Sequence, residues 1–200
     1  MTSGAPPASK REATKQANRE AILSGARGVF IDLGYGAASV RDIVRSTGLA
    51  TGTFYNYFPD KESVLRALVD EIAAEARARV RAARRSAATL EDFVAGGFRA
   101  YLEFIASDPA TVALMRRNAG TIRTLFGDPA LGAGADELRA DLADGVASGA
   151  LPPHDTELMA AAMVGAGVEV GMRMVEREPL DVEEAVMFCT NIFLGAFSRL

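Results

Sequence analysis

Apolar residues recur three and four positions apart along most of the chain, and no segment alternates apolar and polar residues for long. Positions three and four apart share one face of a helix, whereas alternate positions share one face of a strand. The pattern therefore predicts an all-α protein with about nine helices.

Turn residues and changes of pattern give approximate helix boundaries. The predicted helices cover about residues 15–33, 40–47, 50–57, 60–85, 90–107, 110–118, 135–147, 156–177 and 182–199, and the segment 121–127 allows a further turn or two. The segment DPALGAG, residues 128–134, is predicted to be a loop because it is rich in glycine and proline.

The segment from Ser39 to Lys61 predicts two short helices joined by a tight turn. Ser39 is a good N-cap, and Asp42 stands three residues later, as in a capping box. Gly48 ends the first helix at a place where a backbone with positive φ is needed. The second helix then begins near Ala50, so the two helices form a helix-turn-helix.

Small and polar residues occupy the start of the second of these helices. A helix-turn-helix places that end against base edges in the major groove of DNA. Thr51 and Thr53 offer hydroxyls, and Asn56 offers an amide, all of which bond bases or phosphates. The segment is therefore predicted to contact DNA.

These motifs together resemble the DNA-binding domain of the tetracycline-repressor (TetR) family of transcriptional regulators. The resemblance is carried by FIDLGYGAAS, VRDIVRSTGLATGTFYNYF and PDKESVL, which follow one another over residues 30–65, and by the long helix after them. It is close over about residues 18–70 and extends to the remainder only in the layout of helices. It implies a disordered basic arm at 1–14, a three-helix DNA-binding domain at 15–61 and a helical effector-binding and dimerisation domain at 62–200.

By this resemblance, ten residues are expected at the DNA. They are Ser39, Val40, Arg41, Thr51, Gly52, Thr53, Tyr55, Asn56, Tyr57 and Lys61. Phe54 and Phe58 are expected to face inward, and core packing remains an alternative for Tyr55 and Tyr57.

A dimer of such domains reads two half-sites about one or more turns of DNA apart, so a palindromic operator is expected. The arm residues Lys10, Arg11 and Lys15 either reach the DNA or form a solvated helix end.

The distribution of charge agrees with a DNA-contacting head. The chain has a formal net charge of −4, but residues 1–66 carry +3 and the remainder carries −7. A basic first third joined to an acidic remainder is typical of a specific DNA-binding domain attached to a body that does not bind DNA.

The sequence gives little support for an enzyme or for a membrane protein. There is one histidine, His154, and one cysteine, Cys189, so no histidine-based metal cluster, catalytic triad or disulfide framework is available. GAGVEVG at 165–171 has the wrong glycine spacing for a dinucleotide site. The longest apolar run, 158–168, is shorter than the 20 or so residues that span a membrane, and no signal peptide is evident. We expect a cytoplasmic, nucleoid-associated protein with no catalytic residue, metal or cofactor.

The resemblance also implies an effector pocket in the body. The expected lining is Phe93, Tyr101, Phe104, Met115, Arg116, Ile122, Arg123, Phe126, Met163, Glu169 and Met172. Phenylalanine and methionine suit an adaptable pocket for an apolar ligand, although an ordinary core uses the same residues. Glu169 and Arg173 lie four apart in the most apolar helix, where they pair with each other, pair across a dimer or contact a polar ligand.

The last two helices are predicted to form a dimer interface. Residues 158–175 are apolar nearly all round, and such a helix must be buried on every side. Two helices from each chain form a four-helix interface in a two-fold dimer. The expected contacts are Val164, Val168, Val175, Val186, Cys189, Phe193 and Phe197. Burial inside a monomer is the alternative.

The sequence thus predicts a homodimeric repressor that leaves its operator when a small molecule binds the body. Three alternatives remain open: an activator of the same fold, a DNA-binding dimer without an effector, and a helical enzyme or binding protein that has acquired a helix-turn-helix. The effector is not specified, since drugs, fatty-acyl compounds and flavonoid-like aromatics all suit such a pocket.

Overall fold

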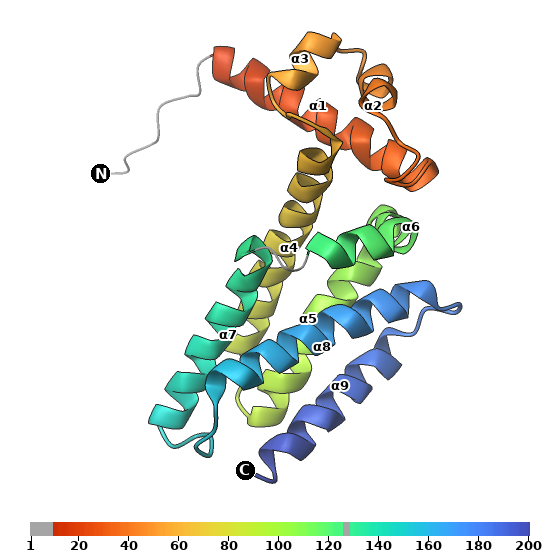
Figure 1. Ribbon diagram of the computed structural model, residues 1–200. Helices are drawn as coiled ribbons and strands as arrows, with labels where there is room; N and C mark the ends of the chain where they lie inside the picture. Colours follow the sequence, from red (N-terminus) through yellow and green to blue (C-terminus); the bar gives the residue numbers. More distant parts are fainter. Residues whose placement is uncertain (1–9, 126–128) are drawn as a thin grey trace. The chain divides into compact units, whose positions relative to one another are not determined.

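The computed structural model describes residues 10–125 and 129–200, which form nine α-helices, α1 to α9, and no strand (Figure 1). The predicted all-α class is therefore confirmed. The chain divides into two compact units, one ending at Val69 and the other beginning at Asp70. The division falls inside a helix, α4. A boundary of the DNA-binding domain between residues 61 and 62 stays a prediction.

The first unit contains three helices and the beginning of a fourth. They are α1 (Lys10–Asp32), α2 (Val40–Thr47), α3 (Thr51–Tyr55) and the part of α4 (Lys61–Arg85) that ends at Val69. Its core holds Ile22, Phe30, Ile43, Phe54, Val64 and Leu65, which are almost completely buried. Residues 10–14, predicted to be part of a disordered arm, belong to α1, and residues 1–9 lie outside the described residues.

Helix α1 ends in the way its sequence predicts. Gly34 follows the helix with φ of 77°, a left-handed conformation that glycine adopts without steric cost. Its amide donates to the carbonyl of Phe30, and the ring of Tyr35 then packs against the ring of Phe30. The chain is thereby turned toward the start of α2.

The second unit consists of the remainder of α4 and five further helices. These are α5 (Leu90–Ser107), α6 (Pro109–Leu125), α7 (Pro129–Ala147), α8 (Thr156–Glu176) and α9 (Val182–Phe197). α5 packs along α9, and α7 packs along α8. Helix α8 also contacts α5, α6 and α9, so it is the central helix of this unit (Figure 1).

Two segments of the body are more helical than predicted. α6 continues to Leu125 through a kink at Asn118, whose side-chain amide donates to the carbonyl of Leu114 at 2.8 Å. α7 begins at Pro129, so the predicted loop at 128–134 is wrong from residue 129 onward. Proline suits the first turn of a helix, and a Cβ at Gly134 would make only an ordinary contact with the side chain of Arg77 on α4, at 3.6 Å.

Ion pairs hold α7 to α4. The Arg84 side chain is nearly buried, and its Nε donates to Oδ2 of Asp141 at 2.7 Å. Arg81 pairs with Glu137 one turn earlier. These contacts bring acidic residues of α7 to the arginine-rich part of α4.

By length and composition alone, helix α8 could cross a membrane. The mean hydropathy of its most apolar 18 residues is 1.5. The sequence argument, based on an uninterrupted run of eleven apolar residues, did not anticipate this. Four helices pack around α8, and its charged residues Glu169 and Arg173 form ion pairs. These contacts are those of the core helix of a globular unit.

Candidate functional site

The helix-turn-helix forms as the sequence predicts. The Ser39 hydroxyl accepts a hydrogen bond from the Asp42 amide, and Asp42 Oδ2 accepts from the amide and the hydroxyl of Ser39. The side-chain and backbone hydrogen bonds from Ser39 lower the pKa of Asp42. This capping box fixes the first turn of α2, and the Ser39 hydroxyl, predicted to lie at the DNA, is engaged within it.

The turn between α2 and α3 depends on one glycine. Gly48 ends α2 with φ of 69°, in the left-handed region. A Cβ at Gly48 would meet nothing within 4 Å, so the restriction on this position comes from the backbone alone. A residue with a side chain is destabilised in this conformation by about 1–2 kcal/mol.

Two alanine substitutions compare the conformational requirement of the turn with that of the helix that follows it. We expect Gly48→Ala to lower the free energy of unfolding of the first unit by about 1 kcal/mol. Gly52, which is exposed within α3 and also has open space around it, is the matched control. Gly52→Ala should raise the stability by about 0.5–1 kcal/mol, because alanine is the better helix former. Urea unfolding of both variants checks this, and equal effects would contradict it.

Close packing holds α2 against α1. A Cβ placed on Gly25 of α1 would lie 2.4 Å from the Ser46 hydroxyl and 2.8 Å from a methyl group of Thr47. The missing side chain at Gly25 therefore lets the two helices approach. This contact was not predicted, because a glycine inside a helix gives no sign of which helix it faces.

The second helix divides its side chains between the core and the solvent. Phe54 and Phe58 are buried and their rings pack together, as predicted. Four residues predicted to contact DNA are exposed, and two more are half-buried. The exposed ones are Thr51, Gly52, Tyr55 and Asn56, and the half-buried ones are Thr53 and Tyr57. These residues place two hydroxyls, two phenols and an amide at one end of the head.

Tyr55 and Tyr57 differ in their surroundings. Tyr55 is 54% exposed, and its ring meets the buried Phe54 edge-on. The Tyr57 hydroxyl accepts a hydrogen bond from Asn18 of α1 at 3.4 Å. Core packing is therefore excluded for Tyr55, whereas Tyr57 bridges α1 and the end of α3.

The two basic residues predicted near the start of α2 and α4 also differ. Arg41 is exposed in the first turn of α2, one residue after the half-buried Val40. Lys61 instead turns its ammonium inward, where it donates to the carbonyls of Tyr35 and Ala38 at 2.7 and 2.8 Å. The predicted phosphate contact of Lys61 does not fit this geometry.

The residues predicted to line an effector pocket fall into two groups. The first is apolar or aromatic: Phe104, Met115, Ile122, Met163 and Met172 are buried, and Phe93 and Tyr101 are half-buried. The second is charged: Arg116 and Glu169 are exposed and Arg123 is half-buried. Phe126 lies outside the described residues. A role in effector binding stays a prediction for both groups.

Tyr101 of α5 packs against α8 through two glycines. A Cβ on Gly171 would lie 3.1 Å from the ring of Tyr101, and one on Gly167 would lie 3.9 Å from it. Burial raises the pKa of the Tyr101 hydroxyl. The glycines of α8 therefore make room for an aromatic ring with a polar end in the interior.

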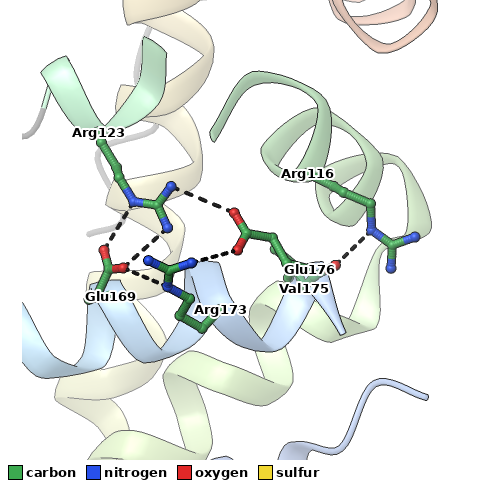
Figure 2. A network of polar contacts seen from close by, with 6 residues as sticks. All are labelled: Arg116, Arg123, Glu169, Arg173, Val175 and Glu176. Carbon is green, nitrogen blue, oxygen red and sulfur yellow. Dashed lines mark hydrogen bonds and ion pairs between the residues drawn. The ribbon is translucent and has the colours of Figure 1, made fainter. Parts of the chain in front are cut away.

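The charged group forms a network across α6 and α8 (Figure 2). Arg123 bonds Glu169 through two nitrogens at 3.0 and 3.2 Å and lies 3.6 Å from Glu176. Arg173 bonds both glutamates. Two arginines and two glutamates thus neutralise one another on a partly exposed surface. Of the alternatives for Glu169 and Arg173, pairing within the chain is the one seen.

Arg116 has a separate role at the end of α8. Its Nε donates to the carbonyl of Val175 at 2.7 Å (Figure 2). Its Nη1 pairs with Glu178. The last carbonyls of a helix have no partner within the helix and favour a cation. Arg116 therefore joins α6 to the C-terminal end of α8.

The network makes the stability of the body depend on pH in acid. The hydrogen bond from Arg123, together with the charges of Arg123 and Arg173, lowers the pKa of Glu169 from its ordinary 4.5. A carboxyl group whose pKa is lowered by folding stabilises the fold above that ordinary value, and this contribution is lost as the pH falls through the lowered pKa. We expect Glu169→Gln to be less stable than the wild type at pH 7 and equal to it near pH 2.

Thermal unfolding between pH 7 and pH 2 checks this expectation. The difference should be small, since the pair is half-exposed and screened by salt. Asp136→Asn, at an exposed carboxylate on α7, is the control and should show no such convergence. A constant difference between Glu169→Gln and the wild type at all pH values would contradict the account.

Most residues of the predicted dimer interface are buried within the single chain. They are Val175, Val186, Cys189, Phe193 and Phe197, and their place in a dimer interface stays a prediction. Phe193 stacks on Phe98 of α5, and burial raises the pKa of Cys189 to about 11. Only Val164 and Val168 of the predicted set are half-buried.

Other apolar residues are exposed on α8 and α9. Met187, Phe188 and Ile192 of α9 are 56%, 57% and 47% exposed, and Leu158 at the start of α8 is 69% exposed. We call the first three the outer face of α9. None of the three was among the predicted dimer contacts, because periodicity does not show which of two apolar helix faces lies outward. Large apolar side chains gathered on one exposed helix face are typical of an interaction surface.

Comparison with known proteins agrees with this architecture. Residues 22–68 match the family model described as bacterial regulatory proteins, tetR family. The HTH-type transcriptional repressor KstR2 of Rhodococcus jostii (strain RHA1) is 32% identical over 99 residues, which are 48% of this chain and 48% of that protein. The chain therefore matches about half the length of this relative.

Solved structures match over nearly the whole chain. The fatty acid degradation regulator FadR from Bacillus halodurans aligns with a TM-score of 0.73 and 24% identity over 89% of this chain and 95% of that one. The transcriptional regulator FadR from Bacillus subtilis, solved in complex with stearoyl-CoA, aligns with a TM-score of 0.72 and 21% identity over 90% and 98%. At these identities the match shows a common fold for both units.

Proposed function

Because this chain belongs to the TetR family of bacterial transcriptional regulators, we propose that it is a homodimeric repressor that binds a palindromic operator and leaves it when a small molecule binds the body. The observation that carries the DNA-binding part is the division of α3 into a buried aromatic face and an exposed polar face. Such a helix presents hydroxyls and an amide to base edges while its phenylalanines hold it in place.

The contacts divide by chemistry. Thr51, Thr53 and Asn56 carry short groups that hydrogen-bond base edges, so they select the sequence. Arg41, Tyr55 and Tyr57 are placed to contact the sugar-phosphate backbone, which positions the head without reading sequence. Arg41 is exposed at the positive end of α2, where phosphate is favoured further by the helix dipole.

We infer the dimer interface from the outer face of α9. Two copies of an isologous interface bury the same apolar residues against each other around a two-fold axis. Met187, Phe188 and Ile192 are the only large apolar residues of α9 that the single chain leaves exposed. A four-helix arrangement of α8 and α9 from two chains removes this surface from water and presents two heads to two half-sites.

The body is proposed to bind a mainly apolar effector. Buried methionine and phenylalanine side chains lie on α5, α6 and α8, and Tyr101 of α5, whose ring packs against the glycines of α8, adds a hydroxyl that offers a hydrogen bond. The B. subtilis FadR neighbour was solved with stearoyl-CoA, so long-chain acyl compounds are the first class to test. An effector releases DNA only if it binds the DNA-free conformation more tightly than the DNA-bound one.

Gel shift with DNA flanking the native gene tests the operator. We place the protein in the cytoplasm, where that DNA is accessible. The purified full chain should retard a labelled flanking fragment in the presence of excess random duplex, and acyl compounds that raise its thermal midpoint should release it. Loss of the band to random competitor would contradict sequence-specific binding. Ligands that stabilise the chain without releasing DNA would contradict the repressor mechanism alone.

A further inference from the structure

We propose that Lys61 is a positioning residue that fixes the loop before α2 for DNA binding, and that it does not bind phosphate. This inference rests on the proposed DNA-binding function, which it deepens. Lys61 is the first residue of α4, and both carbonyls that accept hydrogen bonds from its ammonium lie in the loop that joins α1 to α2.

The ammonium of Lys61 is held by three groups of that loop. It donates to the carbonyl oxygen of Tyr35 at 2.7 Å and to that of Ala38 at 2.8 Å. It also lies 4.4 Å from the centre of the Tyr35 ring, within the range of a cation–π interaction. A lysine ammonium has three N–H donors. Two of them serve the carbonyls, and the ring covers the ammonium as well, so little of it remains for a phosphate.

The loop needs a cation from elsewhere in the chain. α1 has no basic residue in its last turn, although the C-terminal end of a helix favours a positive charge. The chain leaves α1 through the left-handed Gly34, after which the carbonyls of Tyr35 and Ala38 point to Lys61. Without the ammonium, two part-buried carbonyls lose a charged donor.

The position of Ala38 connects this contact to DNA. Ala38 is buried and directly precedes Ser39, the N-cap of α2. The carbonyl that Lys61 holds therefore belongs to the peptide that leads into the capping box. Arg41 follows in the first turn of α2. Fixing this peptide sets the direction in which α2 begins and, because α3 packs on α2, the direction in which α3 meets the base edges.

Salt dependence distinguishes positioning from phosphate binding. Each phosphate neutralised by a protein cation contributes about 0.9 to the slope of log K against log salt, so one lysine per protomer contributes about 1.8 in a dimer. A positioning residue changes the affinity without changing this slope by that amount. Lys61→Met removes the charge and keeps most of the side-chain length.

The experiment compares Lys61→Met with Arg41→Met in the full-length protein. Affinity is measured by fluorescence anisotropy at several salt concentrations, with the flanking duplex that the wild type retards and at a temperature where every variant is folded. We expect Lys61→Met to weaken binding about tenfold with the slope nearly unchanged, and to lower the thermal midpoint by about 4–8 °C. Arg41→Met should lower the slope by about 1.8 and leave the midpoint within about 2 °C.

A second variant guards against a poorly folded Lys61→Met protein. Tyr35→Leu removes the ring that covers the ammonium and changes no charge. It should lower the thermal midpoint, leave the salt slope unchanged, and combine with Lys61→Met less than additively. Full additivity would show that the two residues do not act together, and this would overturn the proposal.

Two other outcomes would also overturn it. One is a Lys61→Met protein that melts like the wild type and loses about 1.8 from the slope, because that behaviour belongs to a phosphate contact. The other is a Lys61→Met protein that differs from the wild type in neither midpoint nor affinity. If the wild type binds no duplex at all, the proposed function fails, while the melting of Lys61→Met, Tyr35→Leu and the double variant still decides whether Lys61 holds the loop.

Discussion

Replacing Phe54 by alanine is expected to unfold the DNA-binding head and abolish operator binding. Phe54 has no exposed surface and packs against the rings of Tyr55 and Phe58. Truncating a buried phenylalanine destabilises a protein by about 3–5 kcal/mol. A unit of this size has a free energy of unfolding of the same order. Anisotropy should show binding weakened more than 100-fold, while circular dichroism should show that the second unit still melts cooperatively.

The neighbouring residue provides the matched control. Tyr55 follows Phe54 in α3 but is mostly exposed. Tyr55→Ala should change the free energy of unfolding by less than about 0.5 kcal/mol and still weaken DNA binding, because we propose that its phenol contacts the backbone of the duplex. If Phe54→Ala binds DNA as the wild type does, or if both variants unfold alike, the division of α3 into an inner and an outer face is wrong.

Replacing Phe188 by glutamate is expected to separate the dimer and remove specific DNA binding. Phe188 lies at the centre of the outer face of α9, between Met187 and Ile192 in the sequence. A charge buried without a partner in an apolar interface costs several kcal/mol per site, and a two-fold axis places two such charges together. Sedimentation should show a monomer, and affinity for a palindromic duplex should fall more than 100-fold, since a single head reads one half-site.

The control for Phe188→Glu introduces the same change elsewhere. Leu33, at the end of the first helix, is a large apolar residue that is also well exposed. Leu33→Glu should leave the protein dimeric. A dimeric Phe188→Glu protein with normal DNA affinity would show that the outer face of α9 is not the subunit interface.

The sequence was sufficient for the head because its signals are local. The N-cap at Ser39, the left-handed turn at Gly48 and the inward Phe54 all depend on residues a few positions away. The N-cap and the left-handed glycine favour the same local backbone conformation in any fold. The exposed side of α3 then follows from the buried side.

The body was less predictable because its contacts are between distant segments. The start of α7 was predicted to be a loop on glycine content, yet Gly134 lies in contact with Arg77 of α4 within a helix. The α9 residues predicted to form the dimer interface are buried within the single chain, where α9 packs along α5. Periodicity shows that a face is buried and does not show which partner buries it.

For Lys61, the sequence could not predict which groups its charge would meet. A lysine after a recognition helix is expected to meet phosphate on grounds of charge. Its carbonyl partners lie 23 and 26 residues earlier in the chain, in a loop whose path is set by Gly34. Only the folded geometry brings these groups together.

Selection from a random pool of duplexes tests the central claim most directly. The purified full-length protein would be mixed with random double-stranded DNA at physiological salt, and the bound fraction sequenced after several rounds. The account predicts enrichment of one inverted repeat whose half-sites lie about one or more helical turns apart, and loss of the preference for particular bases in Thr53→Ala and Asn56→Ala. A pool that remains random, or that converges on a single half-site without symmetry, would contradict it.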